Sequence, residues 1–259
     1  MKSEIHPTAI VDSKAEIDEG VIIGAYCIIG EGVCIKRGSK LISNVVIEGN
    51  TEIGENCTIY PFTSIGLPPQ DLKYKGEKTG LTIGNNNIIR EYITIHRASV
   101  GGDGLTTIGD NNFLMAYVHI AHDCKIGSHI IMANAATLGG HVVIEDYAVV
   151  GGLTAIHQFT RIGAYAMVGG FSGVGQDIPP YMIASGARAK LFGLNTIGLK
   201  RHGFSDTAIN ELKKAYKILF REKRTLTDAI KKIQEDLPYT DEIKHLIDFI
   251  QQNKRGICR

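Results

Sequence analysis

The chain has 259 residues, of which 44% are hydrophobic and 21% are charged, a composition typical of an ordinary globular protein. Lysine and arginine number 28 against 27 aspartates and glutamates, so no overall basic field indicates nucleic-acid binding. The N-terminal segment lacks the apolar core of a secretion signal, and no run of about 18 apolar residues could span a membrane, so we expect a cytoplasmic protein. Five cysteines at irregular spacings match neither a disulfide framework nor paired zinc-binding motifs, and reduced thiols are expected.

The strongest pattern is a large aliphatic residue at every sixth position. One run extends without a break from Ile5 to Ile65, and a second extends from Ile108 to Val174. A short run of Ile83, Ile89 and Ile95 lies between them. Residues two apart in a strand lie on the same face. The residues two positions before the aliphatic ones of the first run are small or β-branched: Ala9, Ala15, Val21, Cys27, Val33, Ser39, Val45, Thr51, Cys57 and Thr63.

A period of six residues is neither helical nor a plain strand alternation, and it predicts a short strand followed by a turn. Three such units make one triangular coil, and stacked coils form a parallel β-helix. Each coil buries its aliphatic residues inside and pairs its backbone with the neighbouring coils.

Two segments interrupt the period and are predicted to loop outward. In residues 66–82, "GLPPQDLKYKGEKTGLT", the phase is kept but Asp71 and Glu77 occupy the aliphatic positions. Residues 96–107, "HRASVGGDGLTT", add one position to two units and are rich in glycine. Loops on a rigid scaffold are favoured places for binding residues.

The pattern changes after Val174. The prolines in "QDIPPYMIASG" cannot lie inside a central ladder. From Ser205, a plausible helix cap, apolar residues follow helical spacing, and residues 227–236 and 240–252 predict two more short helices. We therefore expect a β-helix over residues 1–190 and a helical domain over residues 191–259.

The stretch "HIAHDCKIG", residues 119–127, concentrates groups that could do chemistry. Cys124 shares the inward register of Cys27 and is expected to fill the core. Counting one coil forward places Gly140 above His122 and His141 above Asp123, and a second coil places Gln158 above Gly140. His157 falls in the adjacent column, so His122, His141 and His157 are predicted to converge on one corner.

Such a corner supports two kinds of chemistry. Three histidines can bind zinc with an open position. Alternatively, His122 acts as a general base, Asp123 holds its tautomer and the Gly140 amide receives an oxyanion. The spacing alone leaves both open.

Several motifs around this corner resemble the UDP-N-acetylglucosamine acyltransferase family of lipid A biosynthesis: "QDLKYKGE", "IREYITIHR", "HIAHDCKIG", "GGHV", "HQFTRIG", "MVGGFSGVGQDIPPY" and "GLKRHGFS". The resemblance implies a left-handed parallel β-helix with a C-terminal helical domain, assembled as a homotrimer with active sites between subunits. It implies transfer of a 3-hydroxyacyl chain from acyl carrier protein to the glucosamine 3-hydroxyl of UDP-N-acetylglucosamine. Because a thioester is already activated, neither a metal nor another cofactor is implied.

The resemblance also implies roles for individual residues. His122 is the base, beside Asp123, and the Gly140 amide is the oxyanion donor. Gly152 and Gly170 stack one coil apart, and glycine at the latter position implies an acyl chain of about 12 to 14 carbons or longer. The positions that match the substrate cleft and the nucleotide site are Gln70, Asp71, Lys73, His96, His119, His141, His157, Gln158, Asn195 and Arg201.

Two positions depart from the family pattern. Ile197 stands where members usually have a carboxylate near the ribose, and Arg188 stands where a histidine is common near the carrier arm. The acceptor could also be the 3-amino analogue of the sugar. Three other classes of protein are alternatives. A related N-acyltransferase normally has an extra N-terminal domain, and a zinc hydratase of the γ-carbonic anhydrase kind would contain stoichiometric zinc. A purely structural β-helix would need no histidine corner.

Overall fold

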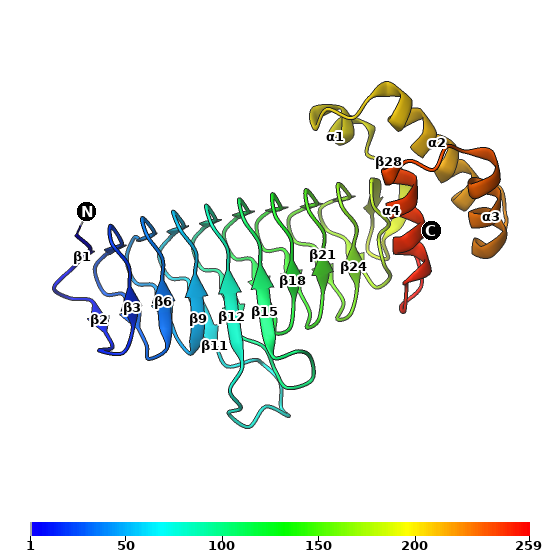
Figure 1. The fold of residues 1–259 in the computed structure, drawn as a ribbon. Coiled ribbons are helices and arrows are strands. Elements are labelled where there is room, and N and C mark those ends of the chain that lie inside the picture. Colours follow the sequence, from blue (N-terminus) through cyan, green and yellow to red (C-terminus); the bar gives the residue numbers. More distant parts are fainter. Residues whose placement is uncertain (1) are drawn as a thin grey trace.

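The computed structural model describes residues 2–259 and shows a three-sided, left-handed parallel β-helix followed by a group of helices (Figure 1). The N-terminus lies at one end of the β-helix, and the helices gather at the other end. Two loops leave the wall near the middle of the long axis. The fold class predicted from the six-residue period and the family resemblance is confirmed.

Three sheets form the three walls, and up to β26 every third strand of the chain joins the same sheet in parallel. At the end of sheet A, β27 pairs in parallel with β25, and β28 pairs antiparallel with β27. Sheet A contains β1 (Glu4–Ile5), β4 (Ile22–Ile23), β7 (Lys40–Leu41), β10 (Thr58–Ile59), β13 (Ile88–Ile89), β16 (Phe113–Leu114), β19 (Ile131–Met132), β22 (Val149–Val150), β25 (Met167–Val168), β27 (Met182–Ser185) and β28 (Lys190–Leu194). Sheet B contains β2 (Ile10–Val11), β5 (Ile28–Ile29), β8 (Val46–Ile47), β11 (Ser64–Leu67), β14 (Thr94–His96), β17 (His119–Ile120), β20 (Thr137–Leu138), β23 (Ala155–Ile156) and β26 (Gly173–Val174). Sheet C contains β3 (Glu16–Ile17), β6 (Val33–Ile35), β9 (Asn50–Ile53), β12 (Gly80–Ile83), β15 (Leu105–Ile108), β18 (Lys125–Ile126), β21 (Val143–Ile144) and β24 (Arg161–Ile162).

The short strands explain the six-residue period. In β8, Ile47 points into the core and is fully buried, whereas Val46 points outward and is partly exposed. The same register continues in the next coil, where Ile65 pairs with Ile47 and Ser64 with Val46. Inward side chains therefore stack along the axis, and the core is one continuous column. The first coil is open to solvent at its end, and Ile5 is 46% exposed there.

Both predicted loops leave the wall, over residues 68–79 and 97–104, while the first and last residues of each predicted segment belong to strands. Loop 66–82 leaves after β11 and returns at β12, and loop 96–107 leaves after β14 and returns at β15. Arg97 joins them, since its guanidinium donates to the Gly66 carbonyl at 2.8 Å and to the Tyr74 hydroxyl at 3.2 Å. The loops are therefore held against each other on one side of the β-helix.

The C-terminal part follows the sequence prediction with additions. The helices are α1 (Thr196–Arg201), α2 (Asp206–Phe220), α3 (Leu226–Asp236) and α4 (Asp241–Gln251). Ser205 caps α2 as predicted, while the six-residue helix α1 was not expected. Sheet A also continues beyond the two prolines, because they occupy the connection before β27, which pairs with β25. The domain boundary at residue 190 stays a prediction, and β28 crosses it.

The helices are tied to the last coil through Arg161. The Arg161 guanidinium donates to the Asp177 carboxylate at 3.0 Å, and Asp177 is almost completely buried. The same guanidinium donates to the Phe249 carbonyl and lies over the Phe249 ring. Within residues 2–259, no helix is both long and apolar enough to cross a membrane.

The inward register predicts a large difference between neighbouring residues of one strand. Ile47→Ala removes a fully buried side chain and should lower the free energy of unfolding by about 2 to 5 kcal/mol. Val46→Ala changes the outer face of the same strand and should cost less than about 1 kcal/mol. Denaturant unfolding of both variants measures the difference, and equal losses would contradict the assigned register.

Candidate active site

His122 and Asp123 lie at the corner between β17 of sheet B and β18 of sheet C. The chain turns sharply there because Asp123 has a left-handed backbone with φ of 60°. Both side chains leave the hydrophobic core, as the repeat predicted. The Asp123 side chain is nevertheless 1% exposed, whereas that of His122 is 15% exposed. The aspartate is thus a buried charge outside the core, and the histidine beside it is partly exposed.

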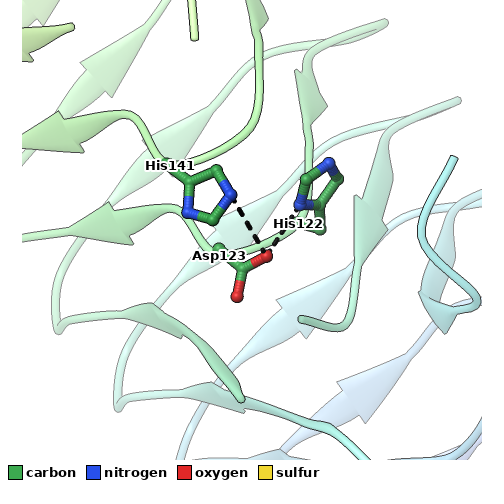
Figure 2. A group of neighbouring side chains, drawn as sticks. All are labelled: His122, Asp123 and His141. Atoms are coloured by element: carbon green, nitrogen blue, oxygen red, sulfur yellow. Dashed lines mark hydrogen bonds and ion pairs between the residues drawn. The ribbon is translucent and has the colours of Figure 1, made fainter. Parts of the chain in front are cut away.

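The two side chains are hydrogen-bonded to each other (Figure 2). His122 Nδ1 lies 2.7 Å from Asp123 Oδ2. An ionised carboxylate can only accept, so this bond places the proton of neutral His122 on Nδ1. The other ring nitrogen, Nε2, is then left without a proton. This arrangement is suited to a general base.

His141 comes from the next coil and completes the cluster. Its Nε2 lies 3.7 Å from the same Asp123 oxygen, and its ring stands edge-on to the His122 ring at 5.3 Å. The ring is also stacked on Phe159, one further coil along, at 4.5 Å. Stacking therefore fixes the His141 plane without using its nitrogens.

Gly140 lies directly against the His122 ring. A Cβ atom at this position would come within 2.6 Å of His122 Cε1, so a larger residue would displace the imidazole. The Gly139 and His141 amides bond to neighbouring coils, at 2.9 and 3.0 Å. Among the described residues, the Gly140 amide makes no such bond, so it is available to an oxygen beside His122.

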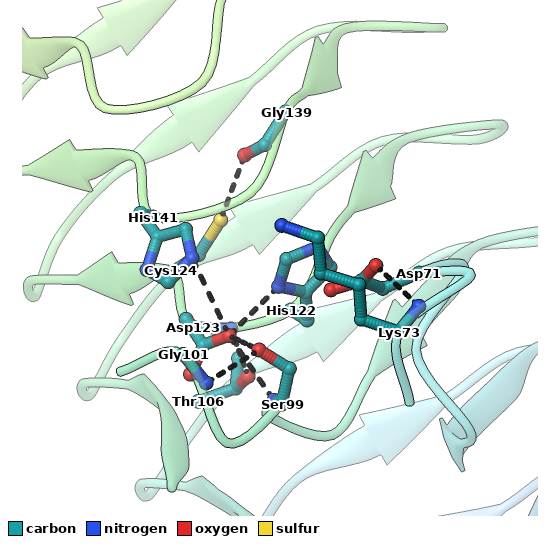
Figure 3. Close-up of polar contacts among 10 residues, drawn as sticks. All are labelled: Asp71, Lys73, Ser99, Gly101, Thr106, His122, Asp123, Cys124, Gly139 and His141. Carbon is teal, nitrogen blue, oxygen red and sulfur yellow. Dashed lines mark hydrogen bonds and ion pairs between the residues drawn. The ribbon is translucent and has the colours of Figure 1, made fainter. Parts of the chain in front are cut away.

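A cavity of about 540 Å³ opens beside the pair, between the wall and both loops. Figure 3 shows Asp71 and Lys73 of loop 66–82 beside His122. Gln70, His141 and Gln158 line the same cavity. Sheet B carries an adjoining cavity of about 410 Å³, whose lining includes Gln70, His96, His119, His122, Gly140 and Gln158. Most of the predicted cleft residues are therefore brought together.

His96 and His119 form a second histidine pair in the adjoining cavity, with ring centres 5.5 Å apart. His96 Nδ1 bonds to the Pro68 carbonyl at 2.7 Å, and His96 Nε2 is buried without a hydrogen-bond partner. Burial, followed by the nearby His96 and His122, lowers the pKa of His119 to about 4. His119 is therefore neutral at physiological pH.

The predicted convergence of three histidines is wrong for His157. Its ring lies in a different cavity of about 540 Å³ together with Arg188. There, His157 Nδ1 lies 3.1 Å from the Gln158 carbonyl. Counting by whole coils gives the column of a residue but not the direction of its side chain. Two coils, not three, supply the cluster.

Four further predicted residues lie away from the His122 cavities of their own chain. Asn195 caps α1 by accepting from the Gly198 amide at 3.1 Å, and it donates to the Tyr165 carbonyl at 2.9 Å. Arg201 is the last residue of α1 and is exposed. Gly152 and Gly170 stack as predicted, but at the corner between sheets A and B.

Cys124 is a core residue, as the repeat predicted. It is fully buried, and its thiol donates to the Gly139 carbonyl at 3.2 Å. Burial raises the pKa of Cys124 to about 12, so the thiolate is not formed near neutral pH. The histidine and cysteine in "HIAHDCKIG" therefore do not act together.

Two contributors were not identified from the sequence. Ser99 of loop 96–107 donates from its hydroxyl and its amide to the Asp123 carboxylate, at 2.7 and 3.0 Å (Figure 3). Thr106 accepts from the Asp123 amide at 2.8 Å. Ser99 lies where loop 96–107 is out of phase with the repeat, so stacking could not place it, and the position of the loop next to the polar corner was the one available signal. Thr106 belongs to β15, two positions before Ile108 in the inward register, so counting could have placed it.

The cluster could also hold a metal ion. One ligand atom each from His122, Asp123 and His141 lie within 4.8 Å of one another. Two imidazoles and a carboxylate are a common donor set for zinc. His122 Nδ1 and Asp123 Oδ2 already form a short hydrogen bond with each other, so a metal bound by both atoms would have to replace that bond.

Known proteins resemble this chain over nearly its whole length. A family model described as UDP-N-acetylglucosamine O-acyltransferase, domain 2, matches residues 177–258, and a model of six bacterial transferase hexapeptide repeats matches residues 105–140. The acyl-(acyl-carrier-protein)–UDP-N-acetylglucosamine O-acyltransferase of Thermodesulfovibrio yellowstonii is 70% identical over 99% of this chain and 100% of its own. Its counterpart in Syntrophobacter fumaroxidans is 50% identical over the same shares.

Solved structures of UDP-N-acetylglucosamine acyltransferases are also similar to this chain. The UDP-N-acetylglucosamine O-acyltransferase of Moraxella catarrhalis is 44% identical and superposes with a TM-score of 0.95, over 98% of this chain and 99% of its own. The corresponding enzyme of Bacteroides fragilis is 38% identical, with a TM-score of 0.93 over 98% and 100% of the two chains.

The lowered pKa of His119 predicts a pH dependence of stability. Between pH 6.5 and about 4 the unfolded chain binds a proton that the folded protein does not, so the free energy of unfolding falls as the pH falls. His119→Gln removes this contribution, and its denaturation midpoint should decrease less than that of the wild type between pH 7 and pH 4.5. The exposed His6→Gln serves as the control and should follow the wild type. Equal decreases for wild type and His119→Gln would contradict the prediction.

Proposed function

Because the chain belongs to the UDP-N-acetylglucosamine O-acyltransferase family, we propose that it transfers a 3-hydroxyacyl chain from acyl carrier protein to the glucosamine 3-hydroxyl of UDP-N-acetylglucosamine, in the cytoplasm. This is the first step of lipid A biosynthesis. The observation that carries the proposal is the His122–Asp123 pair, whose free Nε2 lies beside Gly140 in an open cavity.

The chemistry follows from this geometry. His122 Nε2 takes the proton of the sugar 3-hydroxyl, and the hydroxyl oxygen forms a bond to the thioester carbonyl carbon. The carbonyl oxygen becomes an oxyanion and accepts a hydrogen bond from the Gly140 amide. The carbon–sulfur bond then breaks, and the departing thiolate takes the proton from His122. Asp123 stabilises the imidazolium in between.

The polar side chains around the cavity suit a sugar. Gln70, Asp71 and Lys73 on loop 66–82 and Gln158 on the wall offer both donors and acceptors to hydroxyl groups. His96, His119 and His141 extend the same lining. We assign these residues, with His157 in the neighbouring cavity, to the substrates.

We propose a homotrimer assembled through sheet A. The outer face of this sheet exposes Ile88, Ile131 and Met167, and the next corner exposes Tyr92 and Tyr117 in a stack. A contiguous exposed apolar face of this kind is typical of a subunit interface. Asn195 and Arg201 would then bind the nucleotide of a neighbouring subunit's substrate, since they lie away from the cavities of their own chain. The exposed Ile197 offers no carboxylate for the ribose.

The acyl chain is proposed to cross the outer face of sheet B. Between the His122 corner and the corner of Gly152 and Gly170, the outward residues of sheet B are small: Thr137, Ala155 and Gly173. They leave a shallow groove along this face. Two stacked glycines leave the far corner open, which suits a chain of about 12 to 14 carbons or longer. Arg188 lines the cavity beyond Ala155, where the carrier arm is expected.

Zinc-dependent hydration of the γ-carbonic anhydrase kind is the second candidate, favoured by the ligand spacing of His122, Asp123 and His141. Metal analysis of the purified protein distinguishes the two functions. Acyl transfer predicts full activity in the presence of chelators, and stoichiometric zinc required for activity would support the hydratase instead.

The central prediction concerns His122. His122→Ala should lower the rate of transfer from 3-hydroxyacyl carrier protein to UDP-N-acetylglucosamine by at least about 100-fold, because the hydroxyl loses its base. His6→Ala, an exposed histidine of the first coils, should keep the wild-type rate. The same assay with the 3-amino analogue identifies the preferred acceptor. Near-normal turnover by His122→Ala would remove this residue from the mechanism.

A second prediction concerns acyl length. Wild-type protein given a mixture of acyl carriers should form mainly products of about 12 to 14 carbons or longer. Gly170→Met places a long side chain at the open corner, where a Cβ already lies 3.2 Å from the Gly152 carbonyl, and should shift the products to shorter chains. Mass spectrometry of the products measures both. A wild-type preference for chains of about 10 carbons would contradict the assignment.

A further inference from the structure

We propose that Ser99 is a positioning residue for the catalytic pair: it holds the Asp123 carboxylate in the one orientation that keeps the proton of neutral His122 on Nδ1. The inference rests on the proposed function for its kinetic consequence. Its structural part, the effect of Ser99 on the His122 tautomer, can be measured without any substrate.

The contacts of the Asp123 carboxylate are unequal. Oδ2 receives the Ser99 hydroxyl at 2.7 Å, the Ser99 amide at 3.0 Å and His122 Nδ1 at 2.7 Å. Oδ1 is buried and has no hydrogen-bond partner. One oxygen therefore carries all the donors that compensate the buried charge, and two of the three come from Ser99.

Loop 96–107 is built to keep Ser99 in this place. Its start is fixed by the Ala98 amide, which donates to the Gly80 carbonyl at 3.1 Å. Its far side is fixed by an ion pair between Asp103 and Lys125. Gly102 packs over the unpartnered Oδ1, where a Cβ atom would approach to 2.6 Å. Ser99 itself is only 3% exposed, so water cannot readily replace its hydroxyl.

The orientation of the carboxylate decides which nitrogen of His122 can act. While Oδ2 faces Nδ1, the proton stays there and Nε2 is free to accept. Without the Ser99 hydroxyl, Oδ2 keeps only the Ser99 amide and His122 Nδ1 as donors, and the carboxylate can rotate toward its unpartnered oxygen. The bond to Nδ1 then weakens, and the tautomer with the proton on Nε2, which cannot act as a base, gains population.

The test compares four variants of the 259-residue chain by ¹⁵N NMR of the histidine rings at a pH where His122 is neutral. A fifth variant, His122→Asn, identifies the His122 signal. In the wild type the Nδ1–H tautomer should dominate. Ser99→Ala should raise the Nε2–H fraction at least twofold. Ser99→Cys, a weak donor of similar size, should fall between them, and Ser99→Thr, which keeps the hydroxyl, should match the wild type. Thr107→Ala, on the outer face of β15, is the matched control and should change nothing.

Kinetics separates this inference from the proposed function. Ser99→Ala should lower kcat about tenfold with KM within about twofold, because one hydrogen bond to a charged group is lost while the sugar contacts remain. If the wild type transfers no acyl chain, the proposed function fails, and the tautomer comparison still decides the role of Ser99. An unchanged tautomer in both Ser99→Ala and Ser99→Cys overturns the inference, whatever happens to kcat. Should Ser99→Ala fail to fold, Ser99→Cys alone gives the same decision.

Discussion

The in-register backbone ladder between successive coils is the constraint on which the rest of the structure depends. Each short strand pairs with the strand one coil away, so inward residues stack on inward residues and corner residues on corner residues. A parallel ladder of this kind satisfies the hydrogen bonds of the backbone N–H and C=O groups, so successive coils differ mainly in their side chains. The corner of the candidate active site is therefore a consequence of register, because His122 of one coil must lie against Gly140 of the next.

The ladder alone does not make a base. It places His122, Asp123 and His141 together, but an open corner would leave the carboxylate in water. Loop 96–107 supplies the missing part by covering Asp123, and loop 66–82 adds the polar wall of the cavity. A rigid scaffold thus fixes the groups of the candidate active site, while two insertions adjust their burial and their partners.

The periodic part of the molecule could be predicted from the sequence, and the aperiodic part could not. Ile47 and Cys124 fall in the six-residue register, so their burial followed from counting. The handedness came from a family resemblance. Ser99 lies in an insertion that breaks the register, and counting gives the column of His157 but not the direction of its side chain, so counting missed the first and misplaced the second. The six residues of helix α1 are too few to show a helical period of apolar residues, so the sequence did not predict this helix.

The central claim is that His122 Nε2 is the group that meets the acceptor. The structure of the protein bound to UDP-N-acetylglucosamine tests this most directly. The sugar 3-hydroxyl oxygen should lie within hydrogen-bonding distance of Nε2, about 2.6 to 3.2 Å. A sugar bound with its 3-hydroxyl directed away from His122, or a metal ion held between His122 and His141, would contradict the claim.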